Sequence, residues 1–271
     1  MRLPIFMLAL LAAGTAGAAE TRPRTPTPEE IAFFQAALRN STQDVDRWAY
    51  TETTTITVRK GRRRTTTIVR FDPSKPYAEQ YTALPVDGKP PSRKELRKCR
   101  EKNEKREKSA KAAFARAEAR ANGQAPKPTV IPERTGADPA KATVAEDTAE
   151  RLTFEVPVKS TRADFPTENF QFLVQLNKQT GQVEKAMMRV KKPFHMKMLV
   201  RMNAGEATAE FAVVDPAFGP VMKSISGTFG VSFLAIPVDA DAVSTRTDWK
   251  RVKPFDERFS VKMAPLQMLG F

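Results

Sequence analysis

The amino-acid sequence predicts a mainly β fold of the α+β class. We expect a long curved antiparallel sheet that forms an incomplete barrel, with an N-terminal helix and an inserted long charged helix. Many segments alternate apolar and polar residues with the period of a strand and are joined by short turns. Only two segments carry the residues that begin a long helix, and helices do not alternate with strands, so parallel βαβ units are not supported.

The N-terminal segment predicts export. Arg2 precedes an apolar run over residues 3–13, and small residues that suit signal peptidase follow it. The apolar run is too short to span a bilayer, so we expect residues 1–19 to be a cleaved signal peptide. Residues 20–271 are then expected to form a single half-barrel domain in the periplasm.

A first helix is expected over residues 27–41. Thr27 can cap this helix, Pro28 suits its first position, and Glu30 completes a capping box. Its apolar stripe, which should pack against the sheet, consists of Ile31, Phe34 and Leu38.

The first strands follow this helix. Residues 48–58 and 64–71 are rich in Thr, Ile, Val and aromatic side chains and are joined by a basic turn, which indicates a hairpin. The alternation resumes over residues 77–86 after a Pro-containing break, so a third strand is expected there.

Residues 91–150 are interpreted as an insertion between two strands of the same sheet. Ser92 and Glu95 form a second capping box, and Asn122-Gly123 marks the end of the helix. The remainder, up to residue 150, is rich in Pro, Ala and Thr and lacks periodicity, so it is interpreted as a flexible return linker.

The inserted helix is interpreted as a solvated strut. Residues 92–123 hold twelve Lys or Arg against five Glu, and Glu–Lys pairs four residues apart support an exposed helix. Asn103 and Arg106 interrupt its apolar stripe, so the two ends are expected to pack while the centre stays in solvent. The side chains expected to touch an anionic surface are Arg97, Arg100, Lys105 and Lys108.

Seven further strands are expected after the insertion. They cover residues 151–158, 168–176, 183–190, 194–202, 207–214, 224–235 and 258–263. A turn at residues 203–206 is expected to separate the fourth of these strands from the fifth.

Little in the sequence supports covalent catalysis. The chain has one His and one Cys, and His195 lies on the polar side of an expected strand. The acidic pairs Asp239/Asp241 and Asp256/Glu257 are expected in exposed turns. The sequence has no Gly-rich phosphate loop and no metal-ligand spacing, so we expect neither an enzyme nor a bound cofactor or metal.

The formal net charge of +14 indicates anionic partners. An exported chain meets phosphorylated lipid head groups, lipopolysaccharide or acidic proteins, so no nucleic-acid partner is expected. Cys99 is the only cysteine, which excludes an intrachain disulfide. It is interpreted as a partly buried thiol, with an intermolecular disulfide as the alternative, and we expect a monomer.

An apolar surface is the remaining functional signal. After the signal peptide, all eight Met lie beyond residue 186, and Met is frequent where a surface accepts varied hydrophobic ligands. A long curved sheet with few helices leaves an apolar face that needs a ligand or a lid, while an ordinary core packed by the first helix is the alternative. The candidate ligand-binding residues are Phe170, Phe172, Val174, Phe194, Met196, Met198, Val200, Met202, Phe211, Phe229, Val231 and Phe233.

The segments "RFDPSKP", "LPVDGKPPSRKEL" and "VVDPAFGPV", together with the order of elements, support a resemblance. The chain resembles a group of exported half-barrels in the LolA/LolB-like superfamily of outer-membrane lipoprotein carriers. The resemblance covers most of the chain after the signal peptide. It implies a half-barrel, closed by helices, that holds lipid or lipoprotein acyl chains. No ligand residue of that superfamily can be carried over to a position of this chain.

Three functional hypotheses remain open. The first is a periplasmic binding protein that holds a hydrophobic ligand on the sheet. The second is an envelope interaction or scaffold protein whose basic helix binds an acidic protein or an anionic membrane surface. The third is an outer-membrane barrel, indicated by the C-terminal Phe271 and opposed by Pro265 and by outward charges such as Lys197 and Arg201.

Overall fold

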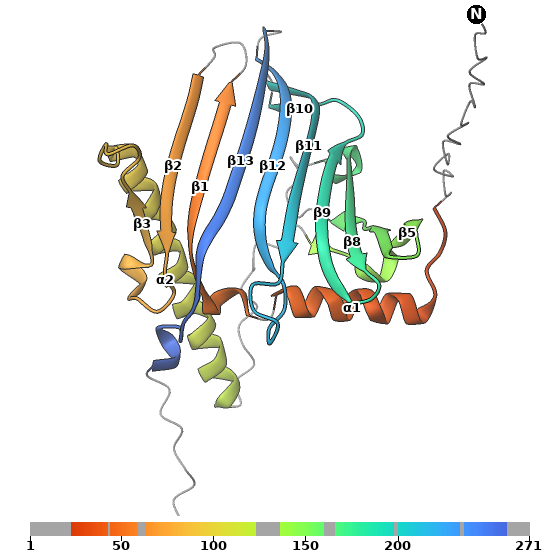
Figure 1. Ribbon diagram of the computed structural model, residues 1–271, viewed down its shortest axis with the longest axis horizontal. Helices are drawn as coiled ribbons and strands as arrows, with labels where there is room; N and C mark the ends of the chain where they lie inside the picture. Colours follow the sequence, from red (N-terminus) through yellow and green to blue (C-terminus); the bar gives the residue numbers. More distant parts are fainter. Residues whose placement is uncertain are drawn as a thin grey trace, which may run out of the picture.

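The computed structural model describes residues 23–42, 44–58, 63–122, 136–159, 166–197, 200–233 and 236–258. The predicted fold class is confirmed: an antiparallel sheet of eleven strands is accompanied by an N-terminal helix and a second, long helix (Figure 1). The expected signal peptide and nearly all of the expected strand 258–263 lie outside the described residues.

The main sheet is open. Its strands follow the order β3-β2-β1-β13-β12-β11-β9-β8-β6-β5, and β10 pairs beside β11. Their bounds are β1 Trp48–Val58, β2 Arg63–Phe71, β3 Tyr81–Leu84, β5 Thr143–Asp147, β6 Arg151–Glu155, β8 Phe170–Asn177, β9 Gln182–Val190, β10 Phe194–Lys197, β11 Val200–Ala212, β12 Val221–Phe233 and β13 Ile236–Arg251. Because β3 and β5 form two separate edges, the sheet does not close into a barrel (Figure 1).

The remaining elements are short, apart from two helices. The helices are α1 Pro28–Thr42 and α2 Arg93–Ala121, and a small second sheet pairs β4 Gly136–Ala137 with β7 Val158–Lys159. The 3-10 turns are η1 Val45–Arg47, η2 Tyr77–Glu79, η3 Pro139–Lys141, η4 Thr167–Asn169 and η5 Asp256–Arg258.

Both helices contact the same face of the sheet, which we call the inner face. Strand register defines this face, because residues directly opposite each other on neighbouring strands point to the same side. One row of such residues crosses nine strands through Val144, Phe154, Val174, Ala186, Ala209, Ile225, Ser244, Thr54 and Thr67. The row is apolar at the β5 end and polar at the β2 end.

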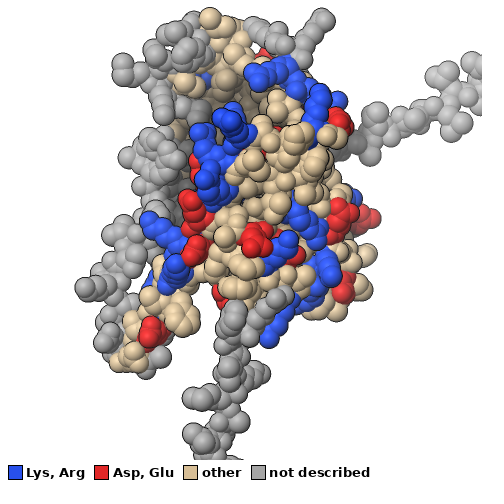
Figure 2. All heavy atoms as spheres, turned by 90° about the vertical axis from the view of Figure 1, so that its left-hand side faces the viewer, with Lys and Arg blue, Asp and Glu red and all other residues tan. Residues whose placement is uncertain are grey.

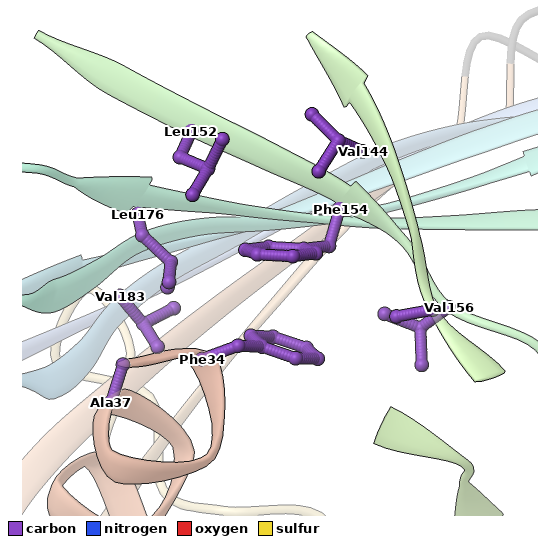
Figure 3. Packing of buried hydrophobic residues seen from close by; sticks show 9 residues of the cluster. Phe34, Ala37, Val144, Leu152, Phe154, Val156, Leu176 and Val183 are labelled. Carbon is purple, nitrogen blue, oxygen red and sulfur yellow. The ribbon is translucent and has the colours of Figure 1, made fainter. Parts of the chain in front are cut away.

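The core lies where α1 crosses the β5–β9 end of the inner face. The rings of Phe34 and Phe154 stack with centroids 4.5 Å apart, and both side chains are fully buried (Figure 3). Burying a large apolar side chain contributes about 1.5–3 kcal/mol, so this stripe holds α1 on the sheet. The buried cluster consists of Phe34, Ala37, Ala142, Val144, Leu152, Phe154, Val156, Leu176 and Val183.

The predicted capping box at the start of α1 is confirmed. The Thr27 backbone N–H donates to Glu30 Oε2 over 2.8 Å, and the Glu30 N–H donates to Thr27 Oγ1 over 3.3 Å. Arg24 bridges Glu30 to Asp147 of β5, with both N···O distances at 2.7 Å. The helix start is therefore tied to an edge strand.

The interpretation of residues 91–150 is partly wrong. The helix begins after the Ser92–Glu95 capping box, as predicted. The segment lies between two strands of the same sheet, β3 and β6, as predicted, although these strands are far apart in the sheet. The expected linker also contains β4, η3 and β5, and Val144 within it is 2% exposed in the core. The sequence did not predict β5 because this segment is rich in Pro and Ala and alternates apolar and polar residues only briefly.

Two strand predictions in the C-terminal half are also wrong. Residues 194–202 form a hairpin rather than one strand, because Phe194 of β10 pairs with Met202 of β11. The expected turn at 203–206 is absent, and β11 continues through it. The sequence prediction missed β13, whose apolar alternation uses small residues such as Ala240 and Ala242 that give a weak pattern.

Candidate ligand-binding site

The structure places most of the twelve predicted ligand-binding residues on the inner face. Those with described side chains are Phe170, Phe172, Val174, Phe194, Val200, Met202, Phe211, Phe229 and Val231. For Met196 and Phe233 only the backbone is described, and Met198 lies outside the described residues. The binding role of these residues stays a prediction.

These residues fall into two groups. Val174 and Phe211 pack against the core under α1, and the buried rings of Phe170 and Phe194 contact each other with centroids 5.2 Å apart. The second group lies on β11 and β12, where Met202, Phe229 and Val231 are only half-buried. The first group serves as ordinary core, and the second belongs to an apolar surface that is incompletely covered.

Glycines shape the inner face around Phe229. A Cβ atom on Gly227 would lie 3.0 Å from the Phe229 ring and 2.9 Å from the Glu206 carbonyl oxygen. A Cβ atom on Gly205 of β11 would lie 3.2 Å from the same ring. The ring therefore rests against the backbone, and this part of the face remains shallow and apolar.

The predicted docking of α2 is wrong for the centre of the helix and for Leu96 and Phe114, although Cys99 of the same expected stripe is buried. Asn103 in the middle of the helix is 4% exposed, whereas Leu96 and Phe114 near its two ends are 51% and 73% exposed. The sequence prediction weighed only apolar packing. The partners that α2 meets are polar groups of the edge strand β3 and of the adjacent turn.

Asn103 binds the edge strand as another strand would. Its Oδ1 accepts a hydrogen bond from the Tyr81 N–H over 2.8 Å, and its Nδ2 donates to the Tyr81 carbonyl over 3.1 Å. Nδ2 also donates to the Ala78 carbonyl over 2.7 Å. Edge strands expose unpaired backbone groups, so this side chain both anchors α2 and protects β3.

Arg106 continues the polar contact one turn further along α2. Its Nε donates to Gln80 Oε1 over 2.7 Å, and its Nη1 donates to Asp46 over 3.0 Å. The guanidinium also lies over the Phe71 ring, 5.0 Å from the centroid. Since Gln80 is 2% exposed, α2 is fixed to the sheet by a buried polar network.

A groove of about 610 Å³ lies between α2 and the inner face of β1 and β2. Its floor is formed by Ile56, Val58 and Val69 with Thr54, Thr65 and Thr67 beside them. Its helical wall is formed by Lys94, Lys98, Cys99 and Lys102. Figure 2 shows Lys and Arg side chains gathered on this side of the molecule. The groove therefore joins an apolar floor to a cationic wall.

The two carboxylates that line the groove are already engaged. Glu52 accepts from Arg246 over 3.0 Å. Glu95 accepts from the Ser92 backbone N–H over 2.6 Å, and this hydrogen bond holds the pKa of Glu95 below its ordinary value. In the described part of the chain, α2 forms ion pairs through Arg97, Arg106 and Lys111. In the described ranges Lys94 and Lys98 form no ion pair, although Lys98 lies close enough to Glu95 to help lower its pKa. Both ammonium groups can therefore also balance a negative charge from outside the chain.

Cys99 lies in the wall between the lysines. Its side chain is 6% exposed, and burial raises the pKa of its thiol above the ordinary value. The thiol was expected to be partly buried and is more buried than that; the small part that remains exposed lines the groove. This burial does not favour an intermolecular disulfide.

The four residues predicted to contact an anionic surface are exposed on α2. Arg100 lies beside Asn103, three residues before it, whereas Lys105 and Lys108 point away from the sheet contact. Arg97 pairs with Glu101 over 3.4 Å, and Glu104 is also exposed on this side. Arg100, Lys105 and Lys108 therefore stand within a surface of mixed charge. Contact of these residues with an anionic surface stays a prediction.

The other polar candidates do not converge on one site. His195 is exposed, as predicted. Asp239 and Asp241 lie within β13 rather than in a turn. Asp256 and Glu257 lie in η5, where they accept hydrogen bonds from Tyr77 and Arg47. Within the described ranges, no cluster of three or more His, Cys, Asp and Glu side chains could hold a metal ion.

Comparison of the chain with protein families, curated proteins and solved structures finds no match. None of the helices in the described ranges combines the length and the apolar character needed to cross a membrane. The proposals that follow therefore rest on the sequence and on the geometry of the inner face.

Proposed function

We propose that this protein is a periplasmic, non-enzymatic binding protein. It holds a hydrophobic ligand, a lipid or the acyl chains of a lipoprotein, against the inner face of its open sheet. The observation that carries the proposal is the contrast between the covered ends of this face and its centre. Residues under α1 are buried, whereas the apolar residues of β11 and β12 are half-buried and Ile225 is 39% exposed.

The opposite face of the same strands supports the choice of the inner face. One row of residues across its centre is Thr66, Thr55, Val243, Ser226, Thr208 and Met187. The matching inner row is Thr65, Ile56, Ala242, Gly227, Ala207 and Met188. A polar outer face can remain in water, but an extended apolar patch typically marks a binding surface.

The export signal and the resemblance to the LolA/LolB-like superfamily support the same proposal. Residues 1–19 have the pattern of a signal peptide, which would place the chain in the periplasm with access to lipids. The open sheet with helices on one face is the arrangement that the resemblance implies. We propose that the protein acts as a monomer and without a cofactor.

A second candidate function is attachment to an anionic membrane surface or an acidic protein through the outer side of α2. It is favoured by the exposure of Arg100, Lys105 and Lys108 on a helix that Asn103 fixes to the sheet. It is weakened by Glu101 and by the other carboxylates on that side. This attachment could accompany ligand binding.

The proposed function is tested with an uncharged fluorescent acyl ester as the probe. Ile225→Glu places a charge at the centre of the inner face and is expected to weaken binding of the ester at least tenfold. Val243→Glu is the matched control, because Val243 is 46% exposed on the outer face of the neighbouring strand. Equal affinity of the ester for the wild type and both variants would contradict the proposal, as would its failure to bind the wild type.

A further inference from the structure

We propose that the groove beside α2 binds the head group of the ligand and that the ligand is a long-chain fatty carboxylate. This inference rests on the proposed function and adds to it the charge and the position of the ligand's polar end. It is drawn from the chemistry of the groove, from the spacing of its lysines and from the path of apolar residues that leaves it.

The groove has two kinds of wall. Ile56 on its floor is 45% exposed although it is a large apolar residue, and Val58 and Val69 lie beside it. The helical wall presents Lys94, Lys98 and Lys102 to the same space. A ligand that fills the groove must therefore be apolar on one side and negatively charged on the other.

The lysines are spaced for one small anion. Lys94 and Lys98 are four residues apart on α2, so their Cβ atoms are about 5–6 Å apart on one side of the helix. Two ammonium groups from such positions can each donate to one oxygen of a single carboxylate. Lys102 lies one turn further, over the Tyr81 ring at 5.0 Å from its centroid, and adds positive charge.

The acyl chain has a path from the groove to the centre of the inner face. Val58 in the floor of the groove pairs with Ala240 of β13, and Ala240 pairs with Phe229 of β12. Ile56 in the same way pairs with Ala242, which pairs with Gly227. Small and apolar residues thus connect the cationic wall to the shallow region around Phe229.

The size of the groove favours a ligand with a single chain. Its volume of about 610 Å³ falls within the range of about 300–1,000 Å³ that is common for small-molecule sites. The groove with its apolar path suits one chain and one small head group. A carboxylate satisfies two lysines without the further hydrogen-bond donors that a large polar head group would need.

The test compares a fluorescent long-chain fatty acid with its uncharged methyl ester. The double variant Lys94→Gln/Lys98→Gln is expected to bind the fatty acid about five- to tenfold more weakly and the ester as tightly as the wild type. The control variant Lys105→Gln/Lys108→Gln removes the same charge from two lysines further along the same helix that do not line the groove. It is expected to change the affinity for the fatty acid less than twofold.

Cys99 supplies an independent measure of position. It is the only cysteine and lines the groove, so the unlabelled fatty acid is expected to slow its reaction with a thiol reagent in the wild type. The same concentration of fatty acid should protect the double variant Lys94→Gln/Lys98→Gln less.

The outcomes separate this inference from the proposed function. The head-group site would be overturned if Lys94→Gln/Lys98→Gln bound the fatty acid as tightly as the wild type, or if the control variant lost as much affinity. The proposed function would survive either result if the wild type still bound the ester. Failure of the wild type to bind either probe would overturn both proposals.

Discussion

Asn103 joins the long helix to the sheet through main-chain groups of β3. Its amide completes two hydrogen bonds with Tyr81 and a third with Ala78, and it is almost fully buried. A buried donor or acceptor that loses its partner costs about 1–3 kcal/mol. Asn103 is therefore a main determinant, together with Arg106, of how firmly α2 lies beside the groove.

We expect Asn103→Ala to lower the free energy of unfolding by about 2–4 kcal/mol, because it leaves buried groups of Tyr81 and Ala78 without partners. Urea unfolding measures this change, and hydrogen exchange should show faster exchange of the Tyr81 amide. Lys105→Ala is the matched control on the exposed side of α2 and is expected to stay within about 0.5 kcal/mol of the wild type. A loss of stability in Asn103→Ala no larger than in this control would contradict the assigned role.

Gly227 provides a second prediction at the scale of one residue. Gly227→Ala is expected to lower stability by about 1–3 kcal/mol, because its Cβ would lie 3.0 Å from the Phe229 ring and 2.9 Å from a backbone oxygen. Gly230→Ala on the same strand is the control, since a Cβ there would meet no atom closer than the Asp239 side chain at 3.4 Å. Thermal unfolding compares the two variants, and equal melting temperatures would show that Phe229 does not rest on Gly227.

At the scale of elements, α1 is attached to the edge strand β5 through a network of charges. Asp147 accepts from Lys178 and Arg24, and these hydrogen bonds hold the pKa of Asp147 below its ordinary value of 3.8. Arg24 also lowers the pKa of Glu30. The network joins the start of α1, β5 and the β8–β9 turn in the part of the molecule that contains the core.

The network predicts a loss of stability in acid. Because the folded pKa of Asp147 is depressed, its contribution is fully present above about pH 3.8 and is lost as the pH falls through the lower, folded pKa. Asp147→Asn should therefore lower the free energy of unfolding at neutral pH by about 0.2–1 kcal/mol, since the ion pairs of Asp147 are partly exposed. The variant should also lose less stability than the wild type when the pH is lowered. Unfolding measured at pH 7 and pH 3 tests this, with Glu146→Gln as the control. A variant with the full acid dependence of the wild type would contradict it.

The sequence predicted elements well where the alternation uses large residues and where helices have capping boxes. β1 and the starts of α1 and α2 were predicted closely for this reason. β13 was missed because its inner side is formed by small residues, although its long pairing with β1 and β12 places it in the middle of the sheet. The β10–β11 hairpin was not predicted because apolar residues recur at every second position from residue 194 to residue 202, as they would in one strand.

At the scale of the whole molecule, the sheet is covered at its two ends by helices of different character. α1 seals one end with apolar side chains, and α2 holds the other end with polar contacts and leaves a groove with lysines. The inner face between them is apolar and half-buried. This division gives the molecule a closed core, an open apolar centre and a groove with a cationic wall on one sheet.

The candidate site could be predicted only in part. Alternation correctly placed Phe229 and Val231 on the apolar face, but it could not show that Phe211 and Val174 belong to the core under α1. The groove was not predicted at all. Its floor comes from β1 and β2 and its wall from α2, and contacts made by polar residues of α2, Asn103 and Arg106, bring these segments together.

The central claim is that the inner face holds a hydrophobic ligand. Native mass spectrometry of the protein purified without detergent from the cells that produce it tests this claim most directly. The account predicts a complex of one chain with one acyl ligand. The ligand should dissociate under collisional activation, and the fraction of protein that carries it should be lower for Ile225→Glu. A ligand-free chain with the same inner face fully packed in a crystal structure would contradict the account.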